Sequence, residues 1–290
     1  REELARGLVL VRQGEITPTR RFDAQLRLLD WVGKPIKRGQ RYIVLQGTTQ
    51  AQGKIIPLGA DGIEPGETAW VQVDLDRPLI LLPGDRFVLQ GFTLSKDHGS
   101  TIGGGLVLRS HPPRRRKRDD EYAALLDRLA EATPAERLAL EVEAAGMGGI
   151  PRERLVERLP FPPGETAKLQ KKLVSEGRIR QYDADAGAVV HPAPFDQLGE
   201  RILGVVNELA EASPMAEGFG RQEVYSRVGS HIPPRVFRMA VERLVKQGKL
   251  EGDADSVAPA GSADRQALRE VAEKVRQRIE SARYQPPKVA

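Results

Sequence analysis

The chain has 290 residues, no cysteine, and 45 basic against 40 acidic side chains, which gives a net charge of +5. Without cysteine, neither a disulfide framework nor a thiolate metal site is possible, and we expect a cytoplasmic protein. No apolar run approaches the roughly 18 residues of a membrane helix, so we expect no membrane contact, and we also expect a monomer. The positive charge is spread along the chain, which permits nucleic acid as a partner without requiring it.

The first half of the chain has the pattern of an antiparallel β-barrel, predicted over residues 16–110. In "FDAQLRL", Phe22, Ala24, Leu26 and Leu28 alternate with polar residues, and "AWVQVDL" has the same period of two. Turn sequences such as "LPGD" separate these runs. About seven short strands without a long helical stretch predict a small barrel.

The stretch "STIGGGLVL" places Gly103, Gly104 and Gly105 inside a predicted strand. A phosphate-binding loop would need a following Lys and Ser or Thr before a helix, and an aliphatic run follows instead. We therefore predict a glycine bulge where barrel strands pass closely. The four histidines lack metal-ligand spacing, and no nucleophile, base or carboxylate pair stands out, so we identify no catalytic or metal site.

The segment "HPPRRRKRDD" separates the predicted barrel from a helical half. Its two prolines end the last strand, and its charges favour solvent, so residues 111–118 are predicted to be an interdomain linker about which the two halves fold independently. Its cations could instead neutralise phosphates. They are Arg114, Arg115, Arg116, Lys117 and Arg118.

The helical half contains a repeat. "FPPGETAKLQKKLVSEGRI" aligns with "IPPRVFRMAVERLVKQGKL", and a short polar ribbon follows each helix after Gly177 and Gly248. Helices followed by a hairpin predict winged helices at residues 119–193 and 194–261, and a truncated third copy at residues 262–290. The sequence thus predicts a multidomain β + α protein, with an antiparallel β-barrel followed by tandem winged-helix domains.

The third helix of each repeat is basic, as expected for a helix that contacts a nucleic-acid groove. The candidate contacts are Lys168, Lys171 and Lys172 in the first copy, and Arg235, Arg238, Lys246 and Lys249 in the second. Acidic residues such as Glu165 and Glu242 are mixed among them, so an ordinary solvated face is the favoured alternative.

Together "GDRFVLQGF" and "STIGGGLVL" resemble the last strands of the third domain of elongation factor Tu and its relatives. "LARGLVLV" resembles the end of the preceding domain, which assigns residues 1–15 to a second barrel. A domain-three-like barrel followed by tandem winged helices is similar to the selenocysteine-specific elongation factors of the SelB family. The resemblance implies a central fragment of such a protein.

The resemblance implies a parent that binds GTP and Mg²⁺ through a GTPase domain absent from this fragment, so no cofactor and no enzymatic activity are expected here. The implied partners are selenocysteinyl-tRNA, the selenocysteine-insertion hairpin of mRNA, and the ribosome. By analogy, the tRNA-proximal residues are His98, Gly99, Ser100 and Thr101. The family arginines are replaced at Gln90 and Ser100.

Two other classes of protein fit parts of the pattern. A DNA-binding winged-helix regulator with a β sensor domain would explain the winged helices, but it leaves the T-I-G-G-G ending of the barrel unexplained. A hydrolase would need a nucleophile and a base, which the sequence does not identify.

Overall fold

The structure is a computed structural model that describes residue 9 and residues 16–95, 99–115, 117–213, 216–261 and 274–281. The chain divides into two compact units, residues 1–144 with 150–179, and residues 145–149 with 180–290. The predicted end of a preceding barrel, at residues 1–15, lies outside the described residues except for Val9. Of the predicted third winged helix, the structure describes only a helical stretch at residues 274–281.

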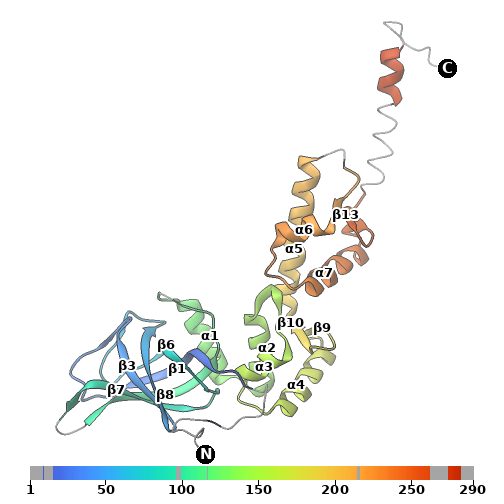
Figure 1. Ribbon diagram of the computed structural model, residues 1–290. Helices are drawn as coiled ribbons and strands as arrows, with labels where there is room; N and C mark the ends of the chain where they lie inside the picture. The colour runs from blue at the N-terminus through green and yellow to red at the C-terminus, as the bar shows by residue number, and fades with distance from the viewer. Residues whose placement is uncertain are drawn as a thin grey trace, which may run out of the picture. The chain divides into compact units, whose positions relative to one another are not determined.

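The first unit contains a closed barrel of six antiparallel strands, in the order β1-β6-β4-β3-β7-β8 (Figure 1). The strands are β1 (Thr19–Leu28), β3 (Arg41–Gln46), β4 (Thr49–Pro57), β6 (Thr68–Leu79), β7 (Arg86–Ser95) and β8 (Gly99–Ser110). A separate two-stranded sheet pairs β2 (Ile36–Lys37) with β5 (Gly62–Ile63). The predicted antiparallel barrel is confirmed.

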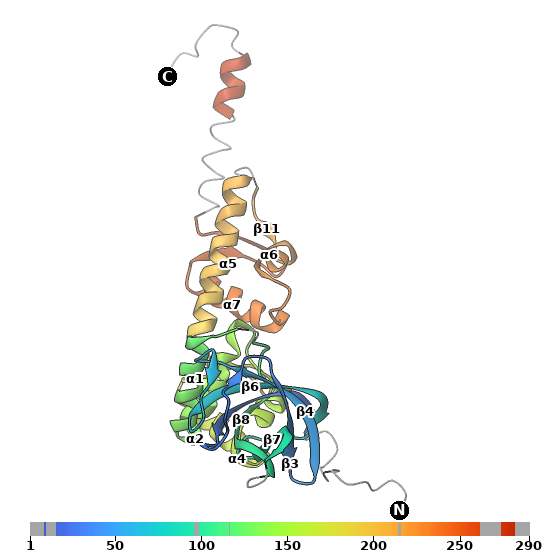
Figure 2. The same cartoon turned by 90° about the vertical axis from the view of Figure 1, so that its left-hand side faces the viewer.

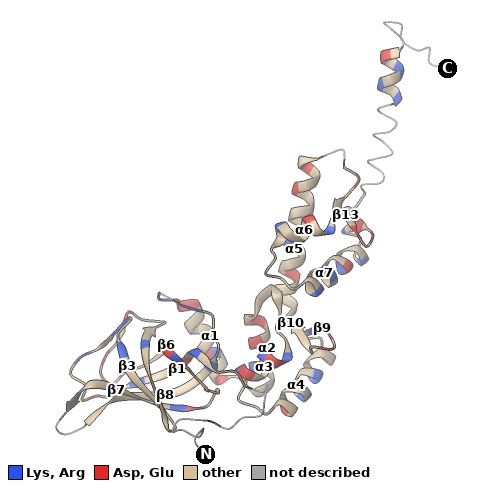
Figure 3. Ribbon diagram, in the orientation of Figure 1, with Lys and Arg blue, Asp and Glu red and all other residues tan. Residues whose placement is uncertain are grey.

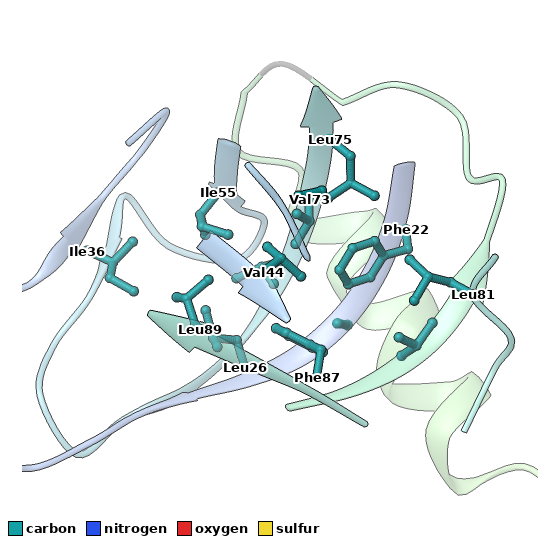
Figure 4. Close-up of a cluster of buried hydrophobic side chains, with 14 of the residues drawn as sticks. Phe22, Leu26, Ile36, Val44, Ile55, Val73, Leu75, Leu81, Phe87 and Leu89 are labelled. Carbon is teal, nitrogen blue, oxygen red and sulfur yellow. The ribbon is translucent and has the colours of Figure 1, made fainter. Parts of the chain in front are cut away.

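The alternating apolar residues of the sequence fill the barrel. Phe22, Leu26 and Leu28 of β1 are fully buried, because successive side chains of a strand point to opposite faces. Figure 4 shows side chains from β1, β3, β4, β6 and β7 directed toward one another in this core. The ring of Phe22 meets that of Phe87 edge to face, with centroids 5.4 Å apart.

The glycine triplet lies where β8 passes close to the backbone of its neighbours. A Cβ atom would lie 2.5 Å from the Arg27 carbonyl oxygen at Gly103, and 2.7 Å from the Phe87 oxygen at Gly104. At Gly105 it would lie 1.9 Å from the Gln25 oxygen. The predicted close passage is therefore confirmed. The nearest register shift between β7 and β8 falls at Ile102, just before the triplet.

Four helices follow the barrel within the first unit. They are α1 (Asp120–Glu131), α2 (Pro134–Ala144), α3 (Arg152–Arg158) and α4 (Pro163–Ser175). Helix α1 buries Leu126 and Leu129 in a cluster with Leu58 and Leu108 of the barrel. The barrel and these helices form one compact unit, so the chain does not divide at residues 111–118, where the sequence predicted the boundary.

The described residues of the segment 111–118 are not a free linker. The Arg115 backbone N–H donates to Oε1 of Gln72 at 2.7 Å, and Nε2 of Gln72 donates to the Pro113 carbonyl at 3.0 Å. Gln72 is fully buried on the outer side of β6, and a buried amide needs such partners. The prolines and the charge run suggested a solvated segment, but this buried amide holds it against the barrel.

The second unit contains a short 3₁₀ turn, a hairpin and a compact winged helix. Its elements are η1 (Gly146–Gly148), β9 (Arg180–Asp183), β10 (Ala188–Val190), α5 (Pro192–Ala212), β11 (Phe219–Gly220), α6 (Arg221–Val228), α7 (Pro234–Lys246), β12 (Leu250–Gly252) and β13 (Ser256–Pro259). The long helix α5 packs against α6, α7 and β13 (Figure 2). No helix that the structure describes is both long and apolar enough to cross a membrane.

The predicted domain of residues 119–193 is divided between the two units. Its helices α1 to α4 belong with the barrel, whereas its hairpin, β9 and β10, belongs to the second unit. The apolar contacts explain the division, because Val190 of β10 is buried in one cluster with Phe195 and Ile202 of α5. The predicted helix stops are confirmed, since Gly177 and Gly248 follow α4 and α7 with φ of +72° and +67°.

Replacing Gly105 with Ala should destabilise the first unit by about 3 kcal/mol or more, because the backbone of two adjacent strands must separate to admit the methyl group. Both tryptophans, Trp31 and Trp70, lie in the first unit, so tryptophan fluorescence during urea unfolding measures its stability selectively. The control is Gly33→Ala, where a Cβ would meet nothing within 4 Å. Equal stability of the two variants would contradict the proposed close passage.

Candidate nucleic-acid interface

A buried polar network connects the barrel to the helices of the first unit. It consists of Asp23, Gln72, Arg109, Tyr122 and Glu141, and all five are buried. The Tyr122 hydroxyl donates to Oδ2 of Asp23 at 2.5 Å, and Nε2 of Gln72 donates to Oδ1 at 2.8 Å. Arg109 donates to the Tyr122 hydroxyl and to Oε2 of Glu141, each at 2.7 Å.

The electrostatics of this network favour a structural role. Burial raises the pKa of Asp23 to about 6, although the hydrogen bonds from Tyr122 and Gln72 oppose the shift. Burial would lower the pKa of Arg109, but the adjacent Glu141 outweighs it, with Tyr122 and Asp23, and Arg109 stays protonated. No substrate reaches these groups, because Asp23 and Glu141 have no exposed surface. The network therefore holds helices to the barrel.

The residues expected near tRNA lie at the start of β8. Gly99 has a φ of +67°, and Ser100 and Thr101 are half-buried. Thr101 is the register partner of Gln90 on β7. The fourth predicted residue, His98, lies outside the described residues.

The basic segment after β8 is largely paired with acids. Arg114 lies 3.8 Å from Asp74, Arg118 lies 2.7 Å from Asp120, and Arg115 lies 2.9 Å from Asp119. Lys117 is exposed, and Arg116 lies outside the described residues. The sequence contains five cations in a row, but Arg114, Arg115 and Arg118 form ion pairs with carboxylates.

The lysines of α4 form the exposed face that the helical period predicts. Lys168, Lys171 and Lys172 are exposed, whereas Leu173 is fully buried. Lys172 lies 3.9 Å from Glu176. Figure 3 shows acidic segments interspersed with the basic ones on α4 and α7.

In the second unit, two of the four predicted contacts are paired. Arg235 of α7 forms an ion pair with Asp183 of β9, and Lys249 lies 3.8 Å from Glu200 of α5. Arg238 and Lys246 are exposed on α7. The basic face of this repeat is thus smaller than its sequence suggests.

Sequence reasoning missed two basic residues of the barrel. Arg38 and Lys54 line a cavity of about 580 Å³ together with Asp74, Arg114 and Arg115. The cavity lies where residues 114 and 115 pass the outer side of the barrel. These residues are far apart in the sequence, and only the pairing of the strands brings them together.

The fold combines a closed antiparallel barrel with a winged helix, and comparisons with known proteins identify both domains. The β-barrel domain of the selenocysteine-specific elongation factor matches residues 22–114, and the winged helix of elongation factor SelB matches residues 211–258. The chain therefore carries two domains of the SelB family of selenocysteine-specific elongation factors.

Individual relatives show the extent of the similarity. The selenocysteine-specific elongation factor of Desulfomicrobium baculatum is 30% identical over 258 residues, which cover 87% of this chain and 39% of the relative. That of Haemophilus influenzae is 22% identical over 253 residues, covering 87% of this chain and 38% of the relative. The chain thus spans about two-fifths of the length of these relatives.

A solved structure of a bacterial selenocysteine-specific elongation factor, EF-Sec, has the same fold. Its TM-score is 0.62 at 15% identity, and the match covers 91% of this chain and 38% of that one. These similarities do not support the alternative of a DNA-binding regulator with a β sensor domain.

Removing one partner of the Arg109–Glu141 pair should destabilise the first unit by about 3–5 kcal/mol, because the other charge stays buried without its closest partner. We expect this cost for Arg109→Met and for Glu141→Leu. The double variant should recover much of the loss, since it removes both charges of the pair together. Urea unfolding followed by tryptophan fluorescence measures all three, and strictly additive losses would contradict the direct pairing.

The buried carboxyl of Asp23 should make the stability of the first unit depend on pH. Its folded pKa of about 6 exceeds the ordinary value of 3.8, so the folded state binds the proton more tightly. The stabilisation is present below about pH 4 and is lost as the pH rises through about 6. The stability of the wild type relative to Asp23→Asn should therefore fall by up to about 3 kcal/mol over that window. A constant difference would contradict the raised pKa.

Proposed function

We propose that the chain serves as the central part of a factor that delivers selenocysteinyl-tRNA to the ribosome and recognises the selenocysteine-insertion hairpin of mRNA. One observation carries this proposal: the similarity to the Desulfomicrobium baculatum elongation factor extends over 258 residues, through both the barrel and the helical half. In this proposal the protein works in the cytoplasm as a monomer.

Within this function, the chain binds and positions RNA and performs no chemical step. Its sequence has no G-x-x-x-x-G-K-[ST] loop. GTP and Mg²⁺ are therefore assigned to a GTPase domain elsewhere in the full-length protein. Calorimetry of the purified chain with GTP is expected to detect no binding.

The barrel is the part assigned to tRNA, and the winged helices are assigned mainly a spacing role. The start of β8, with Ser100 and Thr101, is the tRNA-proximal edge suggested by the family. The charges of the winged helices support a spacer, because Arg235 and Lys249 are engaged by Asp183 and Glu200. A helix whose cations are already paired gains less from phosphate contacts.

The affinity of the chain for a tRNA transcript should exceed its affinity for duplex DNA by at least about tenfold at equal salt, as expected for an RNA-directed factor. Fluorescence anisotropy with labelled tRNA and labelled duplex DNA measures both. Equal or tighter binding of DNA would overturn the proposal. In the same assay, Lys168→Ala/Lys171→Ala/Lys172→Ala tests the spacer role, and a lower salt slope in this variant would contradict it.

A further inference from the structure

We propose that the hairpin β9–β10 masks the N-terminal end of α7 from nucleic acid, with the Asp183 carboxylate occupying the place of a backbone phosphate beside Arg235. The proposal rests on the spacing role assigned to the winged helices above and gives that role a cause. In the order of elements from α5 to β13, α7 is the third helix of a winged helix. The N-terminal residues of such a helix are the ones that enter a nucleic-acid groove.

The hairpin belongs to the first repeat in sequence, but it is packed against the helices of the second. Val190 of β10 is buried in the apolar cluster that joins α5 to α7, and Tyr182 of β9 packs against the same cluster. The turn η1 lies against the residues before α7, since a Cβ atom on Gly148 would lie 3.4 Å from Cδ of Pro233. Apolar packing therefore holds the hairpin beside α7, whether or not a charge pair joins them.

Asp183 is fixed at both oxygens of its carboxylate. Its Oδ1 accepts hydrogen bonds from the backbone N–H groups of Asp185 at 3.1 Å and Ala186 at 3.2 Å, which close the turn of the hairpin. Its Oδ2 forms an ion pair with Nη1 of Arg235. The side chain of Asp183 is 15% exposed, whereas that of Arg235 is 58% exposed. The carboxylate is thus held in place by its own turn, and the arginine is the partner that a phosphate can reach from solvent.

A carboxylate and a phosphate compete for the same guanidinium, because both accept its paired N–H donors. Asp183 has the advantage of being fixed in the same fold, since its pairing with Arg235 costs no translational or rotational freedom. A free RNA loses that freedom when it binds. A phosphate therefore gains little at Arg235 while the carboxylate is in place.

Acidic residues also engage the other end of α7. Arg243 forms an ion pair with Asp196 of α5, and Lys249, just beyond the helix, lies 3.8 Å from Glu200 of α5. These carboxylates, like that of Asp183, belong to elements other than α7. The fold thus supplies anions from outside the helix at both of its ends.

The corresponding helix of the first repeat, α4, differs at the masked position. In the alignment of "FPPG" with "IPPR", Gly164 stands where α7 has Arg235. The acid near Lys172 of α4 is Glu176, at 3.9 Å, which directly follows the same helix. The arginine therefore occurs in the repeat whose third helix lies beside the Asp183 carboxylate.

The test measures binding of a short fluorescein-labelled RNA duplex to the full chain, by anisotropy at several salt concentrations. Asp183→Asn should tighten binding by at least about fivefold at low salt and raise the salt slope by about one, because Arg235 becomes free to contact one phosphate. The amide oxygen of Asn accepts the same backbone N–H groups, so the turn is retained. The matched control, Asp185→Asn, removes the same charge from an exposed residue of the same hairpin and should change affinity by less than about twofold.

The double variant Asp183→Asn/Arg235→Gln separates the ion pair from net charge. The gain of Asp183→Asn should disappear in this variant, and the salt slope should return to its wild-type value, because the freed guanidinium is gone. Arg235→Gln alone should change affinity by less than about twofold, since the arginine of the wild type is already engaged by Asp183.

The remaining outcomes overturn the mask in different ways. Equal tightening in Asp183→Asn and Asp185→Asn, or a gain that survives in the double variant, would reduce the effect to net charge. Unchanged affinity in Asp183→Asn would also overturn the mask, but it would leave the spacing role intact. A marked loss of affinity in Arg235→Gln alone would contradict both, because α7 would then contact RNA without any change to the hairpin.

Discussion

The first unit depends on one buried ion pair, between Arg109 and Glu141. Arg109 is the penultimate residue of the strand that closes the barrel, and Glu141 lies on α2. Each charge would be costly to bury alone, so the barrel requires the helix as the helix requires the barrel. Arg109 also donates to Tyr122, which donates to Asp23 on β1, so the constraint reaches back across the sheet.

Local patterns in the sequence predicted much of the fold, and long-range pairings account for what they missed. The period of Phe22, Leu26 and Leu28 reveals a strand because burial alternates within a few residues. The glycine triplet likewise signals close backbone approach. Arg109, in contrast, lies at the end of the last predicted strand, and nothing local indicates that Glu141 lies against it. A charged side chain favours exposure to solvent, and it is buried here only because a partner of opposite charge, distant in the sequence, lies against it.

The same limit applies to the candidate interface. Helical period correctly placed Lys168 and Lys171 on an exposed face. It did not reveal that Asp183 engages Arg235, because that pair joins a hairpin to a helix of the next repeat. Nor could it bring Lys54 beside Asp74, which requires the register between β4 and β6. The net charge of each segment therefore overestimated the unpaired positive charge of the winged helices and underestimated that of the barrel.

The buried network has an evolutionary consequence for the junction between barrel and helices. Exchange of whole domains between genes is easiest where few contacts cross the boundary. Here a recombination point near residue 118 would separate Arg109 and Asp23 from Glu141 and Tyr122. Both products would then contain charged side chains without their partners. A lineage that replaced the helices would have to change Arg109 at the same step. The barrel and helices α1 to α4 are thus expected to have been inherited as one piece.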